Sequence, residues 1–182
     1  MIDPVLDSPE DLWVFGYGSL MWRPGFDHEE RVLARLDGLH RSLCVYSHVH
    51  RGTRDRPGLV LGLDHGGSCK GIAFRVRPEL RRTTIEYLRA REQVTSVYLE
   101  VQCHVHLVDG RRATAIAYKV DRRHEQYAGR LSDARILDLV RQGEGVSGRN
   151  PDYVIATADH LAELSVRDAH LEAIAAALRN SA

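Results

Sequence analysis

The chain has 182 residues, a length that fits one domain with a substantial core. Its 25 Lys and Arg residues equal its 25 Asp and Glu residues in number, and 43% of the residues are hydrophobic. This balance excludes the basic surface that is typical of nucleic-acid-binding and membrane-surface proteins. We also expect no membrane segment, because no stretch is apolar enough to span a bilayer.

The cysteines and the first residues predict the cellular compartment. Cys44, Cys69 and Cys103 are odd in number and form no C-x-x-C pair, which is typical of reduced, mostly buried thiols. Residues 1–12 are acidic and lack the basic and apolar regions of a signal peptide. We therefore expect a cytoplasmic protein, with residues 1–12 as an N-terminal extension and residues 13–180 as a single domain.

Strand-like segments fill the first two thirds of the chain. The expected strands are 13–17, 31–38, 41–47, 59–63, 69–76, 97–108 and 111–120. Asp109-Gly110, between the last two, is the strongest hairpin signal in the sequence. In the first strand of this hairpin apolar and mostly polar residues alternate, so one face is expected to lie in the core.

Helical patterns interrupt and then follow these strands. One helix is expected from about Pro78 to Gln93, because proline suits a first helical turn. Three more segments, near 131–142, 150–163 and 167–179, have helical spacing, with Asn150-Pro151 and Ser165 as candidate starts. The sequence therefore predicts an α+β fold, a mixed barrel-like β-sheet with an inserted helix and C-terminal helices.

A glycine-containing loop follows the first expected strand. After Val14 and Phe15 the sequence reads Gly16-Tyr17-Gly18-Ser19-Leu20-Met21. Glycine allows backbone amides to turn toward an anion, and Ser19 adds a hydroxyl group. The alternative is a tight turn without a ligand, and a lone G-x-G does not decide between the two.

The inserted helix places one carboxylate among apolar residues. At about 100° per residue, Glu92 falls between Ile85 and Leu88, whereas Glu86 points toward solvent. Burial raises the pKa of a carboxyl group toward the range that suits general acid–base catalysis. The alternative is a buried ion pair with Arg91 or Arg51, and spacing alone leaves both interpretations open.

Two further loops are rich in polar residues and glycine. Arg51 lies in the first, residues 50–58, where an arginine can bind a carboxylate through two nitrogen atoms. The second, residues 143–153, runs into a helix start, and helix N-termini favour anions. A solvated arginine-rich turn and a simple helix connection are the respective alternatives.

Taken together, these segments resemble the ChaC-type γ-glutamylcyclotransferases, the branch specific for glutathione. The matching segments span residues 13–175 and are Val14 to Trp22, His50 to Thr53, Arg56 to Val60, Gly71 to Phe74, Tyr87 to Glu92, and Gly145 to Tyr153. Their order and spacing match as well as their residues. The Arg-Glu pair that ends the helix and the late GVSGRN segment point to this branch within the wider superfamily.

The resemblance implies a reaction and a set of site residues. Family members cleave glutathione into 5-oxoproline and cysteinylglycine without water, metal or nucleotide, so no cofactor, nucleic-acid partner or membrane partner is expected. Glu92 matches the acid–base glutamate, and Gly16, Tyr17, Gly18, Ser19, Leu20 and Met21 match the loop that holds the γ-glutamyl group. Arg51 and Tyr153 are expected as further substrate contacts. Gln93-Val94-Thr95-Ser96 departs from the Lys-Gly-Gly-Tyr type of run in many eukaryotic members, so this wall of the pocket is expected to differ from theirs.

Three other functions compete with this one. The pairs His48/His50 and His104/His106 would each share a strand face, which could bind a metal, but no third ligand is evident. A non-catalytic γ-glutamyl-binding module would lack the glutamate, which is present. A cyclotransferase acting on other γ-glutamyl amino acids or amines stays open as the alternative to glutathione cleavage.

Overall fold

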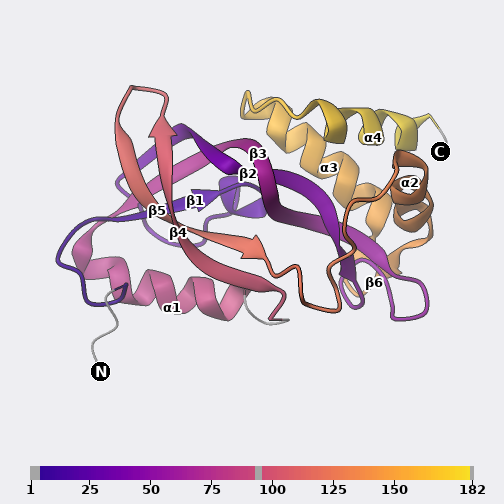
Figure 1. Ribbon diagram of the computed structural model, residues 1–182, viewed down its shortest axis with the longest axis horizontal. Helices are drawn as coiled ribbons and strands as arrows, with labels where there is room; N and C mark the ends of the chain where they lie inside the picture. Colours follow the sequence, from indigo (N-terminus) through magenta and orange to yellow (C-terminus); the bar gives the residue numbers. More distant parts are fainter. Residues whose placement is uncertain (1–4, 93–95, 181–182) are drawn as a thin grey trace. The chain divides into compact units, whose positions relative to one another are not determined.

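The computed structural model describes residues 5–92 and 96–180. Its elements are β1 (Leu12–Gly16), the 3₁₀ turn η1 (Ser19–Met21), β2 (Glu30–Ser47), β3 (Gly58–Val76), the 3₁₀ turn η2 (Pro78–Leu80), α1 (Arg81–Glu92), β4 (Tyr98–Leu107), β5 (Arg112–Val120), α2 (Asp133–Gln142), β6 (Glu144–Gly145), β7 (Gly148–Arg149), α3 (Asn150–Glu163) and α4 (Ala169–Arg179) (Figure 1). The five longer strands form a closed barrel in the order β1-β3-β2-β4-β5. The predicted α+β class, with a barrel-like sheet, an inserted helix and C-terminal helices, is confirmed.

The barrel is a mixed sheet. β1 runs antiparallel to β3, with Val14 opposite Phe74, and parallel to β5, with Trp13 opposite Ala115. β2 and β4 pair antiparallel. Val14 and Phe74 are fully buried, as expected for strand residues that point into a packed interior.

Two predicted breaks between strands are wrong. The expected strands 31–38 and 41–47 are one continuous β2, and 59–63 and 69–76 are one continuous β3. Gly38 in β2 and the pair Gly66-Gly67 in β3 adopt positive φ angles, of 86°, 100° and 65°. Glycine accepts this conformation without strain, so each strand can bend at these residues and continue.

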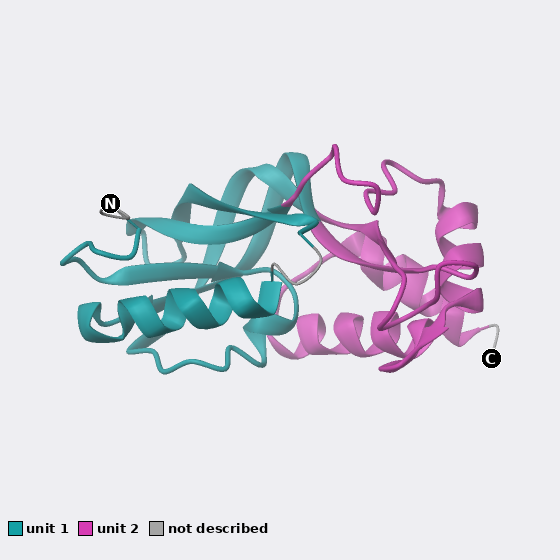
Figure 2. Cartoon of the chain, turned by 90° about the horizontal axis from the view of Figure 1, so that it is seen from below, with its two compact units in different colours: residues 1–40, 63–119 teal, residues 41–62, 120–182 magenta. Residues whose placement is uncertain are grey.

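The chain divides into two compact units (Figure 2). The first contains residues 1–40 and 63–119, and the second contains residues 41–62 and 120–182. β2 and β3 each contribute residues to both units, and in the second unit α2, α3 and α4 pack on one another. That residues 13–180 form a single domain stays a prediction. Among the helices of the described residues, none has the length and apolar character needed to cross a membrane.

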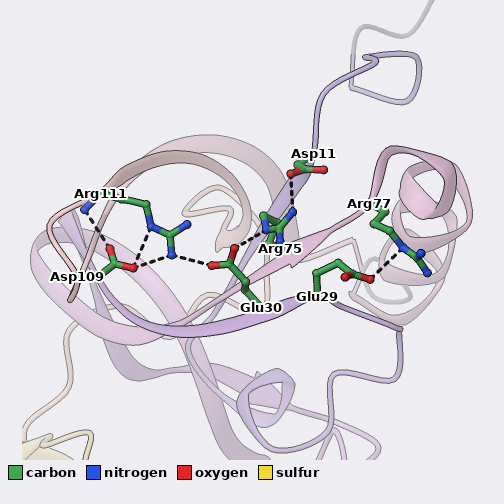
Figure 3. Close-up of polar contacts among 7 residues, drawn as sticks. All are labelled: Asp11, Glu29, Glu30, Arg75, Arg77, Asp109 and Arg111. Atoms are coloured by element: carbon green, nitrogen blue, oxygen red, sulfur yellow. Dashed lines mark hydrogen bonds and ion pairs between the residues drawn. The ribbon is translucent and has the colours of Figure 1, made fainter.

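Charged side chains connect several strand ends of the first unit (Figure 3). Arg75 of β3 contacts Asp11 at 2.8 Å and Glu30, the first residue of β2, at 2.7 Å. Arg111, next to β5, reaches the other oxygen of Glu30 at 2.7 Å and Asp109 at 2.6 Å. These five residues form one continuous ion network, so the starts of β1 and β2 are tied to β3 and to the β4–β5 turn.

Residues 5–10, which precede β1, contact the start of α1. Arg81 donates hydrogen bonds to the carbonyl oxygens of Val5 at 2.5 Å and Glu10 at 3.0 Å. Arg82 pairs with Asp7. Residues 5–10 are thus held against α1 by two consecutive arginines.

Candidate active site

Glu92 is the last residue of α1 and lies on its buried side. Ile85 and Leu88 have no exposed surface, and the Glu92 side chain is 18% exposed. Glu86 faces solvent. The orientation expected from helical spacing is therefore confirmed.

Burial controls the acidity of Glu92. Removal from water raises the pKa of its carboxyl group, and the nearby charge of Arg91, whose Nε lies 3.2 Å from Oε1, acts against this rise. The pKa is raised overall, so burial outweighs the ion pair. The position at the C-terminal end of a helix favours the protonated form too, because the unpaired carbonyl groups there carry partial negative charge.

Arg91 connects the end of α1 to the loop after β1. Its guanidinium donates to Ser19 Oγ at 2.8 Å, to the Arg23 carbonyl oxygen at 2.7 Å and to Tyr87 Oη at 2.9 Å. The ion pair between Arg91 and Glu92 that the sequence suggested is present, but most of the contacts of Arg91 are with other residues. Both of its Nη atoms hold the loop, and only Nε faces the carboxylate.

The loop itself combines buried anchors with one exposed hydroxyl. Tyr17, Leu20 and Met21 are buried, whereas Ser19 is exposed. In the 3₁₀ turn the Met21 amide donates to the Gly18 carbonyl oxygen at 2.9 Å. The amides of Ser19 and Leu20 precede this bond, and the first amides of a helical turn have no carbonyl partner within it.

Close packing requires glycine near this loop. A Cβ atom at Gly71 of β3 would collide with the carbonyl oxygen of Gly16 and the ring of Phe15. Gly25 has a φ of 76°, and a Cβ atom there would overlap the Tyr87 hydroxyl. The loop after η1 therefore lies directly against the helix that carries Glu92. Sequence reasoning missed Gly25 and its packing against Tyr87, although an isolated glycine in a loop is a signal for positive φ.

Arg51 and Tyr153 lie in the second unit and contact each other. The Arg51 guanidinium stacks over the Tyr153 ring at 5.4 Å, and its Nη1 donates to the Arg149 carbonyl oxygen at 3.4 Å. The Tyr153 hydroxyl accepts a hydrogen bond from the Leu61 amide at 3.2 Å. Their expected role as substrate contacts stays a prediction.

The GVSGRN segment docks on the loop that carries Arg51. The Val146 amide donates to the Val49 carbonyl oxygen at 2.9 Å. Asn150 is fully buried, and its amide group both accepts from the Leu59 nitrogen at 2.7 Å and donates to the Leu59 oxygen at 2.8 Å. The Asn150 side chain thus pairs with the backbone of Leu59 as the backbone of a neighbouring strand would. The segment therefore has a structural role in the second unit.

The histidine pairs have other partners. His50 contacts Ser147 Oγ at 2.9 Å, and His104 contacts Thr114 Oγ1 at 3.2 Å. Within residues 5–92 and 96–180, no group of three or more His, Cys, Asp or Glu side chains is arranged to hold a metal ion. The predicted metal-free chemistry is an expectation of the resemblance and does not rest on this observation.

A second polar cluster near Glu92 was missed by sequence reasoning. Tyr118 of β5 donates to Glu100 of β4 at 2.9 Å, and Arg89 of α1 binds both oxygens of Glu100 at 2.7 and 2.9 Å. Residues from three elements form this cluster, so no local pattern could indicate it. Residues 93–95, where the sequence departs from many eukaryotic family members, lie outside the described residues.

Comparison with known proteins assigns the family. A family model described as ChaC-like protein matches residues 12–181. The glutathione-specific gamma-glutamylcyclotransferase of Escherichia coli K12 is 35% identical over 157 residues, covering 86% of this chain and 68% of that protein. Glutathione-specific gamma-glutamylcyclotransferase 1 of Rattus norvegicus is 34% identical over 173 residues, covering 92% and 78%. This chain belongs to the ChaC-like family.

A solved structure supports the fold. A yeast gamma-glutamyl cyclotransferase described as specific to glutathione superimposes with a TM-score of 0.81 at 22% identity, over 93% of this chain and 96% of that one. At 22% identity, this similarity shows that the two proteins share a fold and nothing further.

Proposed function

We propose that this protein is a glutathione-specific γ-glutamylcyclotransferase that cleaves glutathione to 5-oxoproline and cysteinylglycine. The observation that carries the proposal is the half-buried Glu92, whose raised pKa suits proton transfer and whose neighbour Arg91 holds the Gly16–Met21 loop. The names of the E. coli and rat relatives support the same activity.

The chemistry requires one group that first accepts and then donates a proton. The α-amino group of the γ-glutamyl residue attacks its own γ-carbonyl carbon, the new C–N bond closes the five-membered ring, and the bond to the cysteine nitrogen breaks. Glu92, as carboxylate, takes the proton from the attacking amine. As carboxylic acid, it then gives this proton to the leaving nitrogen. A pKa above the usual value for glutamate makes the carboxylate a stronger base toward the amine, and it keeps the protonated form available near neutral pH for the return transfer.

The loop of Gly16, Tyr17, Gly18, Ser19, Leu20 and Met21 is proposed to hold the γ-glutamyl group. The flexible γ-glutamyl chain of the substrate must fold so that its amine and carbonyl groups meet. A rigid loop that binds it in this conformation lowers the entropic part of the activation barrier. Backbone amides and the Ser19 hydroxyl are suitable donors for the substrate carboxylate or for the developing oxyanion. The buried anchors Leu20 and Met21 keep these donors in place before substrate binds.

Arg51 and Tyr153 are proposed as further substrate contacts. A guanidinium group binds carboxylates in a two-point geometry, and its stacking on the Tyr153 ring limits its rotation. The proposal predicts that Arg51→Lys raises KM more than it lowers kcat. A KM equal to that of the parent would remove Arg51 from the site.

The proposed reaction balances without a co-reactant. It consumes no water and transfers no electrons, so the proposal includes no cofactor and no metal. A cytoplasmic location is part of the proposal. It is supported by Cys44, Cys69 and Cys103, which all lie within the described residues and form no disulfide bond there.

The substrate preference is tested by comparing kcat/KM for glutathione and for γ-glutamylalanine, without added metal. If the cysteinylglycine half helps to position the reacting amine, the truncated substrate loses kcat as well as affinity. A clear preference for γ-glutamylalanine would favour the alternative, a cyclotransferase for other γ-glutamyl amino acids or amines. Equal turnover of both substrates would contradict the proposed specificity for glutathione but not the proposed cyclisation reaction.

A further inference from the structure

Glu100 occupies an unusual position beside the proposed acid–base residue. It accepts hydrogen bonds from Nε and Nη2 of Arg89 at 2.9 and 2.7 Å, and from the Tyr118 hydroxyl at 2.9 Å. Its side chain is 15% exposed, and Tyr118 is buried. Such a two-point pair of guanidinium and carboxylate, in partly desolvated surroundings, holds both partners firmly.

Arg89 and Glu92 stand on the same helix at a spacing that permits pairing. Arg89 precedes Glu92 by three residues on α1, the spacing at which side chains of opposite charge pair on a helix surface. An arginine at this position therefore has carboxylates at this spacing on both sides along its own helix, Glu86 and Glu92, besides Glu100 on β4. In the structure two of its guanidinium nitrogens are directed to Glu100.

We propose that Glu100 is a positioning residue that holds Arg89 away from Glu92 and so keeps the acid–base carboxylate free to exchange a proton with substrate. The inference rests on the proposed function for its catalytic meaning, whereas the pairing of Arg89 with Glu100 is a property of the fold. Tyr118 supports the arrangement, because its hydrogen bond fixes the Glu100 oxygen that also binds Arg89 Nε.

Among the described residues, Arg91 and Tyr118 are the ionisable side chains that interact with Glu92. Arg91, on the same helix, has its Nε 3.2 Å from Glu92 Oε1. Burial is the main cause that raises the pKa of the Tyr118 hydroxyl on β5, and the hydrogen bond to Glu100 and the negative charges of Glu100 and Glu92 add to it. With Arg91 largely committed to the loop, a second arginine that turned to Glu92 would stabilise the carboxylate. It would thereby lower the pKa of Glu92 and weaken it as a base.

The test compares Glu100→Gln with the double variant Glu100→Gln/Arg89→Met. Glu100→Gln removes the charge that holds Arg89, so we expect the pKa of Glu92 to fall by at least about one unit and kcat to fall with it. The double variant removes the released arginine, and both values should return toward those of the parent. Glu79→Gln, exposed in η2 just before the helix and ten residues from Arg89, is the matched control.

The pKa of Glu92 is measured by NMR titration of ¹³C-labelled glutamate, with Glu92→Gln identifying the signal, and kcat by glutathione cleavage. An unchanged Glu92 titration in Glu100→Gln, or a double variant no better than the single one, would overturn the proposal. The titration needs no substrate, so absence of cleavage by the parent protein would contradict the proposed function and leave this test intact.

A second variant covers the case in which Glu100→Gln does not fold. Arg89→Lys keeps the positive charge and loses the two-point hold on Glu100. The pKa of Glu92 is expected to fall here too, by less than in Glu100→Gln. An unchanged titration in a folded Arg89→Lys protein would contradict the proposal equally.

Discussion

The Nη2 atom of Arg91 lies 2.8 Å from the Oγ atom of Ser19. This contact joins the last turn of α1 to the loop after β1, two segments separated by 72 positions in the sequence. Because Glu92 is the next residue of the helix, the same contact sets where the proposed acid–base group lies relative to the proposed binding loop.

Replacement of Arg91 by lysine is expected to impair catalysis without unfolding the protein. Lysine keeps the charge, but one ammonium group cannot serve Ser19, Arg23 and Tyr87 together. Loss of the fixed loop geometry should lower kcat/KM by about ten-fold or more. Steady-state kinetics on glutathione check this, with Arg82→Lys at the exposed start of α1 as control. Equal kcat/KM for Arg91→Lys and Arg82→Lys would show that the connection is dispensable.

Replacement of Glu92 by glutamine is expected to leave stability at neutral pH unchanged or increased. Burial raises the folded-state pKa of Glu92, so ionisation opposes folding once the pH exceeds the unfolded value of about 4.3. Glutamine removes this cost. Thermal denaturation should show a Tm for Glu92→Gln at or above that of the parent at neutral pH, with the difference shrinking as the pH falls below about 4. A lower Tm at neutral pH would indicate that the attraction between Glu92 and Arg91 outweighs the cost of burying the carboxylate.

The ion network of Figure 3 is expected to stabilise the first unit at neutral pH and to lose this effect in acid. Hydrogen bonds from Arg111 are the largest cause of the lowered pKa values of Glu30 and Asp109. Carboxyl groups with lowered pKa stabilise the fold above their unfolded pKa of about 4, and this contribution disappears as the pH falls through the folded value.

Glu30→Gln should therefore lower the Tm at neutral pH, less so in about 1 M salt, and have little effect near about pH 2. Glu29→Gln is the matched control, because the Glu29 carboxylate pairs with Arg77 at 3.0 Å, outside the network. Thermal denaturation across the pH range measures both. A loss of stability for Glu30→Gln that persists in acid would contradict the electrostatic explanation.

Asn150 is expected to be a major determinant of stability in the second unit. Asn150→Ala leaves the amide and carbonyl of Leu59 without their partner in a buried position, at a cost of about 1–3 kcal/mol for an unsatisfied group. Urea unfolding measures the change, and Asp152→Ala, exposed in the same helical turn, is the control. A loss for Asn150→Ala no larger than for Asp152→Ala would contradict this assignment.

Local patterns predicted much of the fold. Helical spacing predicted α3 at its observed bounds, and Asp109-Gly110 predicted the turn between β4 and β5, because these features depend on neighbouring residues. The breaks in β2 and β3 were wrong, since Gly66 is held within a strand by a contact of its carbonyl oxygen with His40 Nδ1 at 3.0 Å, 26 residues away. Ser165 was also wrong as a helix start: α4 is capped by Asp168, whose side chain accepts from the Leu171 amide.

Only the part of the candidate site that depends on position along one helix could be predicted from the sequence. The buried orientation of Glu92 follows from its spacing to Ile85 and Leu88. The pairing of Arg89 with Glu100 does not, because it depends on how α1 packs against β4, and a sequence offers an arginine many equivalent carboxylates. Long-range contacts between charged side chains therefore require the structure.

The central claim, that Glu92 mediates an intramolecular cyclisation, is tested most directly by incubating purified protein with glutathione and measuring 5-oxoproline and cysteinylglycine together. We expect equal amounts of the two products from the parent and from the control Glu86→Gln, and a rate for folded Glu92→Gln that is lower by about 10² to 10⁴. Glutamine has nearly the same shape and cannot accept the amine proton. Near-normal formation of 5-oxoproline by Glu92→Gln, or cleavage that releases free glutamate in its place, would contradict the account.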